Sequence, residues 1–591
     1  MTNPNKTRFL WQVPLAAIAL ALSQPALAAA QDDYEALRAD IWEWELDNNP
    51  MLATEVGDRR GDGSLGDGSL EAMDRRTAEQ RAFLSRLDAI DVASLPENLK
   101  IDHAIVRRSL ADSIASDGFA HARFGAITNR WGPHGYVSYL PQSSPFFTLA
   151  DYESYLGRIE DLPATIDATI ARSRGAIANG LTLPCEAMVG YEKQVDSSIV
   201  EQLDKSPLWQ PFTTRPDSIG QQDWAPLLVR ARSAISKDAN ASLAKFARFY
   251  RSEYMPACRT GAPGLAATKG GKEYYDYLVR SYTTTEMSAD EVHKLGLSEV
   301  ARIRAEMETV ASKAGYPTRE AFIEHLRTDP QYYAKTPEEL IMRNAAVAKH
   351  IDGFMPRLFG RLAEMPYTVE PIPAATAPGN TTAYYTGGSF AAGKPGIYWV
   401  NTTELDQRPL WEVPVLTVHE AVPGHHQQIA IQQELDLHPL RRHGTFFTAF
   451  VEGWGLYSER LGIEMGLYDT PAKEMGRLSY EMWRATRLVV DTGMHAKGWS
   501  KAQAIAYMTD NTALSPSNIE AEVNRYITMP GQALAYKLGE LKIRELRSRA
   551  ETALGEKFDL RGFHDAVLEN GAVPLDVLEA HIDGWIAGQQ A

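Results

Sequence analysis

The segment Thr417-Val418-His419-Glu420-Ala421-Val422-Pro423-Gly424-His425-His426-Gln427-Gln428 decides how this chain is interpreted. It begins like a metal-binding helix, because a histidine is followed at once by a glutamate. In the standard arrangement a second histidine lies four positions after the first on the same helix face, and the glutamate is a general base. Here Pro423 occupies that position, so the standard spacing is broken.

Helix geometry shows how large a distortion the histidines need. At about 100° per residue, His425 lies roughly 120° from His419 around a regular helix, and His426 lies about 10.5 Å further along the axis. Pro423 lacks an N–H group and Gly424 permits unusual dihedrals, so a bulge there could return one histidine to His419. We expect His425 to be the second ligand, with His426 as the alternative. A helix break that carries surface histidines is the competing interpretation.

A second segment, FFTAFVEGWGLYSERL at 446–461, predicts a helix that is apolar on nearly every side. Its two carboxylates, Glu452 and Glu459, need partners if they are buried, and a metal ion is one such partner. We expect Glu452 to be the third ligand, presented from the helix that follows the histidines. Glu459, two turns further on, would touch a ligand rather than the ion. The competing interpretation is that Glu452 is an ion-paired core residue.

Two later segments carry polar groups in apolar surroundings. In 481–495, Arg487 and Asp491 have the spacing of a simple ion pair, which we prefer. The alternative is that Asp491 or His495 orients a ligand while an arginine binds a substrate carboxylate. In 522–539 the run EVNRYITMPGQALAYKLG contains two tyrosines whose phenols either stabilise an oxyanion or belong to the core.

Together these four segments resemble the domain-of-unknown-function 885 family of bacterial exported and lipoprotein-like proteins. The residues that carry the resemblance are His419-Glu420, Pro423-Gly424-His425-His426, Phe450-Val451-Glu452-Gly453-Trp454, Arg487-Leu488-Val489-Val490-Asp491-Thr492-Gly493, His495, Gly498-Trp499-Ser500, Arg525-Tyr526 and Pro530-Gly531-Gln532. That family is grouped with the gluzincin metallopeptidases. The resemblance implies a mainly α fold, with a large helical body, a deep cleft and a small β-hairpin or sheet near the active site.

The expected chemistry is that of a zinc-dependent peptidase with one Zn²⁺ ion. His419, His425 and Glu452 would hold the metal, and Glu420 would be the general base. Tyr526 or Tyr536 would bind the oxyanion, and Arg525 would bind a substrate carboxylate if the enzyme is a carboxypeptidase. A hairpin predicted at Thr381–Asn401 would line the cleft as an edge strand, with Tyr398 and Asn401 beside the peptide substrate.

Most other segments have helical periodicity, namely 33–47, 70–90, 99–116, 149–178, 224–254 and 285–311. Ser288 and Glu291 have the spacing of a capping box at the start of the last one. We expect an N-terminal helical region over 29–280 and a C-terminal catalytic region over 281–591.

The chain has 591 residues and a formal net charge of −16, which argues against a nucleic-acid partner. Residues 1–28 read as a signal peptide, with a basic start, an apolar run and a small-residue cleavage pattern. No later stretch is apolar enough for a membrane span. We therefore expect a periplasmic or secreted protein, in which Cys185 and Cys258 either pair or remain two buried thiols.

Three functions remain open at this point. The first is the exported metallopeptidase, of carboxypeptidase or oligopeptidase type. The second is a non-catalytic envelope protein that binds peptides through a degenerate zinc site. The third, a serine hydrolase, is disfavoured because the chain has no G-x-S-x-G sequence. Peptide specificity and oligomeric state are not indicated by the sequence.

Overall fold

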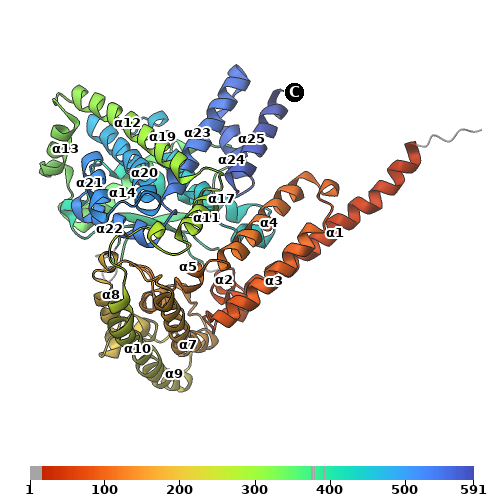
Figure 1. Cartoon of the computed structure of the whole chain (residues 1–591), viewed down its shortest axis with the longest axis vertical. Helices are drawn as coiled ribbons and strands as arrows, with labels where there is room; N and C mark the ends of the chain where they lie inside the picture. The colour runs from red at the N-terminus through yellow and green to blue at the C-terminus, as the bar shows by residue number, and fades with distance from the viewer. Residues whose placement is uncertain (1–15, 374–376, 378–379, 391–392, 591) are drawn as a thin grey trace, which may run out of the picture.

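The computed structural model describes residues 16–373, 377, 380–390 and 393–590. The fold is mainly helical, as predicted, and the described residues also form a small three-stranded sheet (Figure 1). Of the predicted signal peptide, residues 1–15 lie outside the described residues, and 16–28 form the beginning of the long helix α1 (Ala16–Asn48). Among the described helices, none combines the length and apolar character that a membrane span requires.

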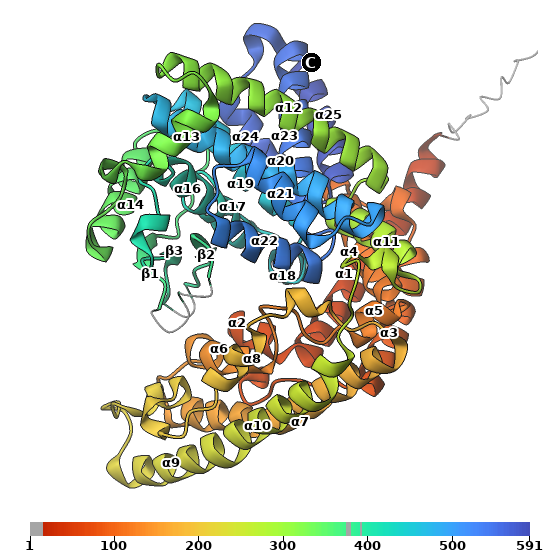
Figure 2. The same cartoon turned by 60° about the vertical axis from the view of Figure 1, so that its left-hand side comes forward.

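The first half of the chain is almost entirely helical. Its α-helices are α1, α2 (Pro50–Glu55), α3 (Leu70–Asp88), α4 (Glu97–Asp117), α5 (Ala120–Phe124), α6 (Tyr136–Ser143), α7 (Leu149–Asn179), α8 (Tyr191–Ser197), α9 (Gln221–Ser233), α10 (Ala241–Phe249) and α11 (Gly271–Thr283). Helices α6 to α10 share an aromatic core that includes Tyr155, Tyr191 and Phe246. Figure 2 shows these helices as a body below the C-terminal helices. The division near residue 280 stays a prediction.

The second half builds the main body around α19 and α23. Its α-helices are α12 (Ala289–Lys313), α13 (Arg319–Thr328), α14 (Pro337–Asp352), α15 (Met355–Leu358), α16 (Val413–Glu420), α17 (His425–Glu434), α18 (Pro439–His443), α19 (Thr448–Glu464), α20 (Pro471–Lys497), α21 (Lys501–Asn511), α22 (Pro516–Thr528), α23 (Leu534–Leu554), α24 (Leu560–Leu568) and α25 (Leu575–Gln590). The capping box of Ser288 and Glu291 is confirmed at the start of α12. Phe450 and Trp454 of α19 are fully buried in the largest core cluster.

The sheet contains the predicted hairpin and one strand that we did not predict. Strands β2 (Ala383–Thr386) and β3 (Gly396–Val400) pair antiparallel, while β1 (Tyr367–Pro371) pairs parallel with the other side of β3. The strand order is therefore β1-β3-β2, and β3 is central. The expectation that Tyr398–Asn401 form an edge strand is wrong, because both hydrogen-bonding edges of β3 are already used.

The side chains expected to touch substrate from this strand point inward. Tyr398 and Asn401 are both completely buried. The Tyr398 hydroxyl donates to Oδ1 of Asn344 at 2.7 Å, and Nδ2 of Asn401 donates to the carbonyl of Ala377 at 2.8 Å. Both residues therefore hold the sheet against its neighbours, and the expected substrate contact is wrong for each.

The two cysteines form a disulfide that closes a long loop. Cys185 and Cys258 are bonded, with their Cα atoms 5.1 Å apart and a sequence separation of 73. Beside the bond, Pro184 and Arg259 form a β-bridge. The disulfide thus joins the connection between α7 and α8 to the segment that leads to α11. The interpretation as two separate thiols is wrong.

Changing both Cys185 and Cys258 to serine should destabilise this region by about 4 kcal/mol, because the closed loop limits the entropy of the unfolded chain. The measurement is the midpoint of urea unfolding, with and without reductant. Reductant should bring the wild-type midpoint to that of the double variant and leave the variant unchanged. Equal midpoints for the oxidised wild type and the variant would contradict the prediction.

Candidate metal centre

A break between two short helices shapes the histidine segment. Helix α16 ends at Glu420, and α17 begins at His425. The N–H group of Gly424 donates to the carbonyl of Val418 at 3.0 Å, so the backbone turns back over the end of α16. A Cβ atom at position 424 would lie 1.9 Å from the carbonyl oxygen of His419. Only glycine fits so close to the preceding helix.

The break brings His425 to His419 and turns His426 away. The rings of His419 and His425 are 4.7 Å apart and nearly perpendicular. Nδ1 of His426 lies 2.9 Å from the Tyr385 hydroxyl, and its ring packs against Tyr367 of β1. Neighbouring helical residues point about 100° apart, so only one of the pair can face His419. The alternative ligand, His426, is therefore wrong.

Helix α19 supplies a carboxylate to the two histidines. Oε2 of Glu452 lies 3.5 Å from Nε2 of His425 and 3.8 Å from Nε2 of His419. The candidate ligand atoms of these three residues all lie within 4.8 Å of one another. Atoms that bind a tetrahedral zinc ion at about 2.1 Å are about 3.4 Å apart. The three side chains therefore lie close enough together to be candidates for a shared zinc site.

A second carboxylate on the same face of α19, that of Glu459, contacts His419 on its other ring nitrogen. Oε1 of Glu459 lies 2.8 Å from Nδ1 of His419, and both side chains are buried. This contact leaves Nε2 of His419 directed at Glu452. A carboxylate on the second imidazole nitrogen is the usual support of a metal-binding histidine. A Cβ atom on Gly455 would lie 2.9 Å from Cε1 of His419, so the glycine makes room for the ring.

Close packing of α19 against α23 brings a tyrosine to the group. A Cβ atom on Gly453 would lie 2.5 Å from Cα of Gly539, so the two helices touch backbone to backbone. One turn before this contact on α23, Tyr536 is close enough to Glu452 to interact with it electrostatically. Burial raises the pKa of Tyr536, so its hydroxyl stays protonated and can donate. The expected position of Tyr536 beside the metal ligands is thus the one observed.

The electrostatics of the group favour a bound cation. Burial raises the pKa of Glu420 to about 7 and that of Glu459 to about 8. Burial acts on Glu452 too, but its hydrogen bond with His425 outweighs this and lowers the pKa of Glu452. Nη2 of Arg484 lies 3.5 Å from Glu459 and neutralises part of this negative charge. A divalent ion between the histidines and Glu452 would stabilise the remaining buried carboxylates.

The second expected oxyanion ligand is already fully hydrogen-bonded. The Tyr526 hydroxyl donates to Oε2 of Glu522 at 2.7 Å and accepts from Nε of Arg487 at 2.9 Å and from Nε1 of Trp483 at 3.1 Å. A tyrosine hydroxyl has one donor and two acceptor positions, so no capacity is left for substrate. The oxyanion role predicted for Tyr526 is therefore wrong.

The preferred ion pair in 481–495 does not form. The carboxylate of Asp491 accepts from the Tyr275 hydroxyl at 2.6 Å and from the N–H of Gly531 at 3.1 Å. Arg487 instead pairs with Glu522 at 3.0 Å. Asp491 therefore joins α11 and the start of the α23 segment to α20, and its expected contact with a metal ligand is wrong.

His495 also has a structural role. Its Nδ1 accepts from the N–H of Leu265 at 3.1 Å, and its Nε2 donates to the carbonyl of Tyr526 at 2.9 Å. Both ring nitrogens are thus used, and His495 has none left to support a metal ligand. The expected ligand-orienting role is wrong, because this ring ties the segment after the disulfide to α22.

Arg525, expected to bind a substrate carboxylate, lies on α22 beside Glu522. Its side chain is 14% exposed. Within the described part of the chain, its Nε and Nη2 atoms form no hydrogen bond. The guanidinium therefore keeps donors for a further anion.

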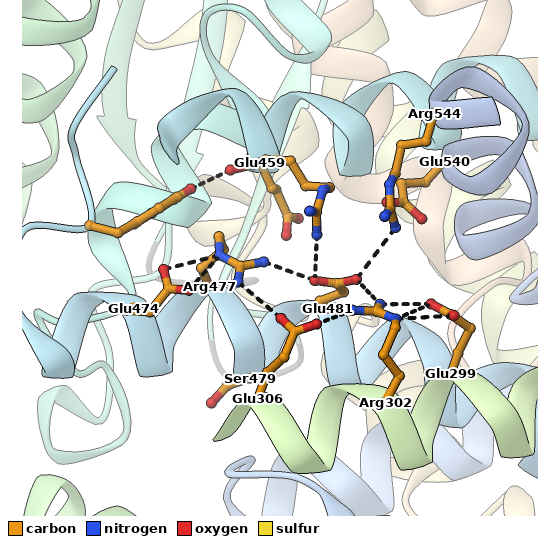
Figure 3. A network of polar contacts seen from close by, with 12 residues as sticks. Glu299, Arg302, Glu306, Glu459, Glu474, Arg477, Ser479, Glu481, Glu540 and Arg544 are labelled. Carbon is orange, nitrogen blue, oxygen red and sulfur yellow. Dashed lines mark hydrogen bonds and ion pairs between the residues drawn. The ribbon is translucent and has the colours of Figure 1, made fainter. Parts of the chain in front are cut away.

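Sequence reasoning missed a charged network on the other side of α19 and α20 (Figure 3). Glu481 accepts from Arg477 at 2.8 Å, from Lys537 at 3.0 Å and from Arg460 at 3.2 Å, and it also contacts Arg302. Burial alone would raise the pKa of Glu481, but these cations hold it well below the usual value. The network joins α12, α19, α20 and α23. The local indications in the sequence are pairs at helical spacing, such as Arg477 with Glu481 and Lys537 with Glu540, but they do not show that the four helices meet.

Comparisons with known proteins identify the family but no activity. A crystal structure from Colwellia psychrerythraea, named as a lipoprotein, is similar with a TM-score of 0.85 and 27% identity, covering 96% of this chain and 100% of that one. A solved structure from Shewanella oneidensis, named as a lipoprotein of unknown function, shares the fold with a TM-score of 0.67 and 19% identity, covering 93% of this chain and 99% of that one. No curated protein matches the chain. The profile described as "Bacterial protein of unknown function (DUF885)" matches residues 50–582, so the chain belongs to this family.

Proposed function

We propose that this protein is an exported, zinc-dependent peptidase of gluzincin-like type, in which His419, His425 and Glu452 hold one zinc ion at the base of a substrate cleft. The observation that carries the proposal is the convergence of these three ligand atoms within 4.8 Å. The carboxylate of Glu459 on the far nitrogen of His419 supports it. When bound, zinc is a Lewis acid that makes water a nucleophile near neutral pH.

The remaining steps of peptide hydrolysis are assigned to residues of the protein. Glu420, next to His419, takes a proton from the attacking water and passes it to the leaving amine. The Tyr536 hydroxyl, a close neighbour of Glu452, donates to the substrate carbonyl oxygen as negative charge develops there. Glu459 holds the His419 ring in place. Export is supported by relatives that are named as lipoproteins.

The test is the zinc content of purified protein and of two histidine variants. Wild type should retain about one zinc per chain, and His419→Ala should retain almost none, because three protein ligands define such a site. The matched control is His426→Ala, since His426 is equally buried but faces Tyr385. Elemental analysis after dialysis provides the measurement.

Equal zinc in wild type and His419→Ala would refute the proposal. If only His426→Ala loses zinc, the zinc ligand is His426 and the proposed ligand set is wrong. Peptide binding without zinc and without turnover would instead place the protein among non-catalytic peptide-binding proteins.

A further inference from the structure

Three arginines from distant parts of the chain face one buried carboxylate. Nη2 of Arg487 lies 3.0 Å from Oε2 of Glu522. Nε of Arg525 and Nη2 of Arg130 each lie 3.6 Å from the other oxygen, Oε1. The Glu522 side chain is 1% exposed. A single carboxylate balances one guanidinium, so this arginine cluster carries more positive charge than its partner neutralises.

Two neighbouring carboxylates, Glu452 and Asp491, attract arginines of the cluster from a distance but form no ion pair with them. Glu452 faces the two histidines, and Asp491 is held by Tyr275 and Gly531. In the described part of the chain, Nη1 of Arg487 and both Nε and Nη2 of Arg525 are buried without a hydrogen bond. Buried guanidinium donors without acceptors are unfavourable. The cluster therefore has the charge and the free donors to bind one more anion.

The cluster lies beside the candidate metal centre. Cζ of Arg487 is 4.3 Å from the centre of the Tyr536 ring, and Tyr536 in turn is a close neighbour of Glu452. One tyrosine ring thus separates the arginines from a metal ligand. Exposure rises from 3% for Arg487 to 14% for Arg525 and 30% for Arg130, so the cluster opens to solvent on the Arg130 side.

Arg130 comes from the N-terminal region. Its loop is fixed to α22 by a hydrogen bond in which the Thr528 hydroxyl donates to Oδ1 of Asn129 at 2.6 Å. The Thr128 hydroxyl accepts from the backbone N–H groups of Arg130 and Trp131 and so shapes the loop. The N-terminal region therefore contributes directly to a site built mainly from C-terminal helices.

We propose that Arg130, Arg487 and Arg525 bind the free carboxylate at the C-terminus of a peptide, so that the protein acts as a carboxypeptidase. The proposal rests on the proposed peptidase function. A guanidinium matches a carboxylate in charge and in bidentate geometry. Because one ring separates the cluster from the metal centre, the bond that is cleaved lies close to the C-terminus. Water adds its hydroxyl to the acyl carbon, the C–N bond breaks, and the released amine takes the proton.

Binding can be tested apart from turnover. The Glu420→Gln variant is dialysed against a mixture of N-acetylated tetrapeptides with free C-termini, and separately against the same peptides as C-terminal amides. Mass spectrometry gives the bound fraction of each. Free acids should bind about 10- to 100-fold more tightly, which is the range for losing a charged hydrogen bond. Equal binding of acids and amides, or no binding of either, would overturn the proposal.

Arginine variants of the Glu420→Gln protein show which residues cause the preference for free C-termini. Arg525→Gln and Arg130→Gln should each weaken binding of the acids and leave binding of the amides unchanged. The control is Arg174→Gln, in an exposed pair with Glu253 on the N-terminal body.

A free-acid preference that survives both variants, or displacement of acids and amides alike by inorganic phosphate, would overturn the proposal. If the wild type cleaves amidated peptides at internal bonds, the carboxypeptidase proposal is refuted, but the proposed peptidase activity is retained. If the protein binds free acids preferentially but contains no zinc and hydrolyses no peptide, the proposed peptidase function is refuted instead.

Discussion

Glu420→Gln should lower the rate of peptide hydrolysis by about 10²- to 10⁴-fold, the usual contribution of a general base. Glutamine has the shape of glutamate but cannot take a proton from water. Glu420 directly follows the ligand His419, and burial raises its pKa to about 7, which suits a group that accepts and returns a proton near neutrality. The measurement is kcat on the tetrapeptide mixture, together with zinc content.

The zinc content separates the possible roles of Glu420. It should stay at the wild-type level in Glu420→Gln, because the three expected ligands are other residues. The exposed Glu364→Gln is the matched isosteric control and should leave both quantities unchanged. A Glu420→Gln variant with wild-type turnover would exclude Glu420 as the base. One that loses zinc would make Glu420 a ligand.

The convergence of His419, His425 and Glu452 was predictable, because each of them stands out in its own segment of the sequence. The spacing of His419 and His425 excludes a shared site on a regular helix, and Pro423 and Gly424 mark where the helix must break. Glu452 stands out as a carboxylate in an apolar helix. The choice between His425 and His426 depends on the path of the turn, which Gly424 sets by its contact with the carbonyl of His419. No local pattern specifies that contact.

The surroundings of the group were not predictable, because their partners come from far along the chain. Arg487 and Asp491 have ideal spacing for an ion pair. However, Arg487 pairs with Glu522, and Asp491 accepts a hydrogen bond from Tyr275. Periodicity reports only contacts within one element. The role expected for Tyr398 failed for the same reason, since β1 makes β3 central by pairing with it from outside the hairpin.

Lys537→Met should destabilise the protein by about 3–5 kcal/mol, the usual cost of removing one partner from a buried ion pair. Lys537 is completely buried. Its Nζ atom lies 3.0 Å from Glu481, 2.9 Å from Glu540 and 3.1 Å from Glu299. Methionine has a similar size but leaves these carboxylates without their shared cation. The measurement is chemical denaturation followed by circular dichroism.

A nearby lysine on the same helix provides the control. Lys542 is 23% exposed and pairs with Glu545 and Glu579, so Lys542→Met should cost only about 0–1 kcal/mol. Adding Glu540→Gln to Lys537→Met should recover part of the loss, because one unpaired charge is removed. Equal effects of the two lysine variants would contradict the prediction. Lys537 directly follows Tyr536, so the network that holds this lysine also fixes the start of α23 against Glu452.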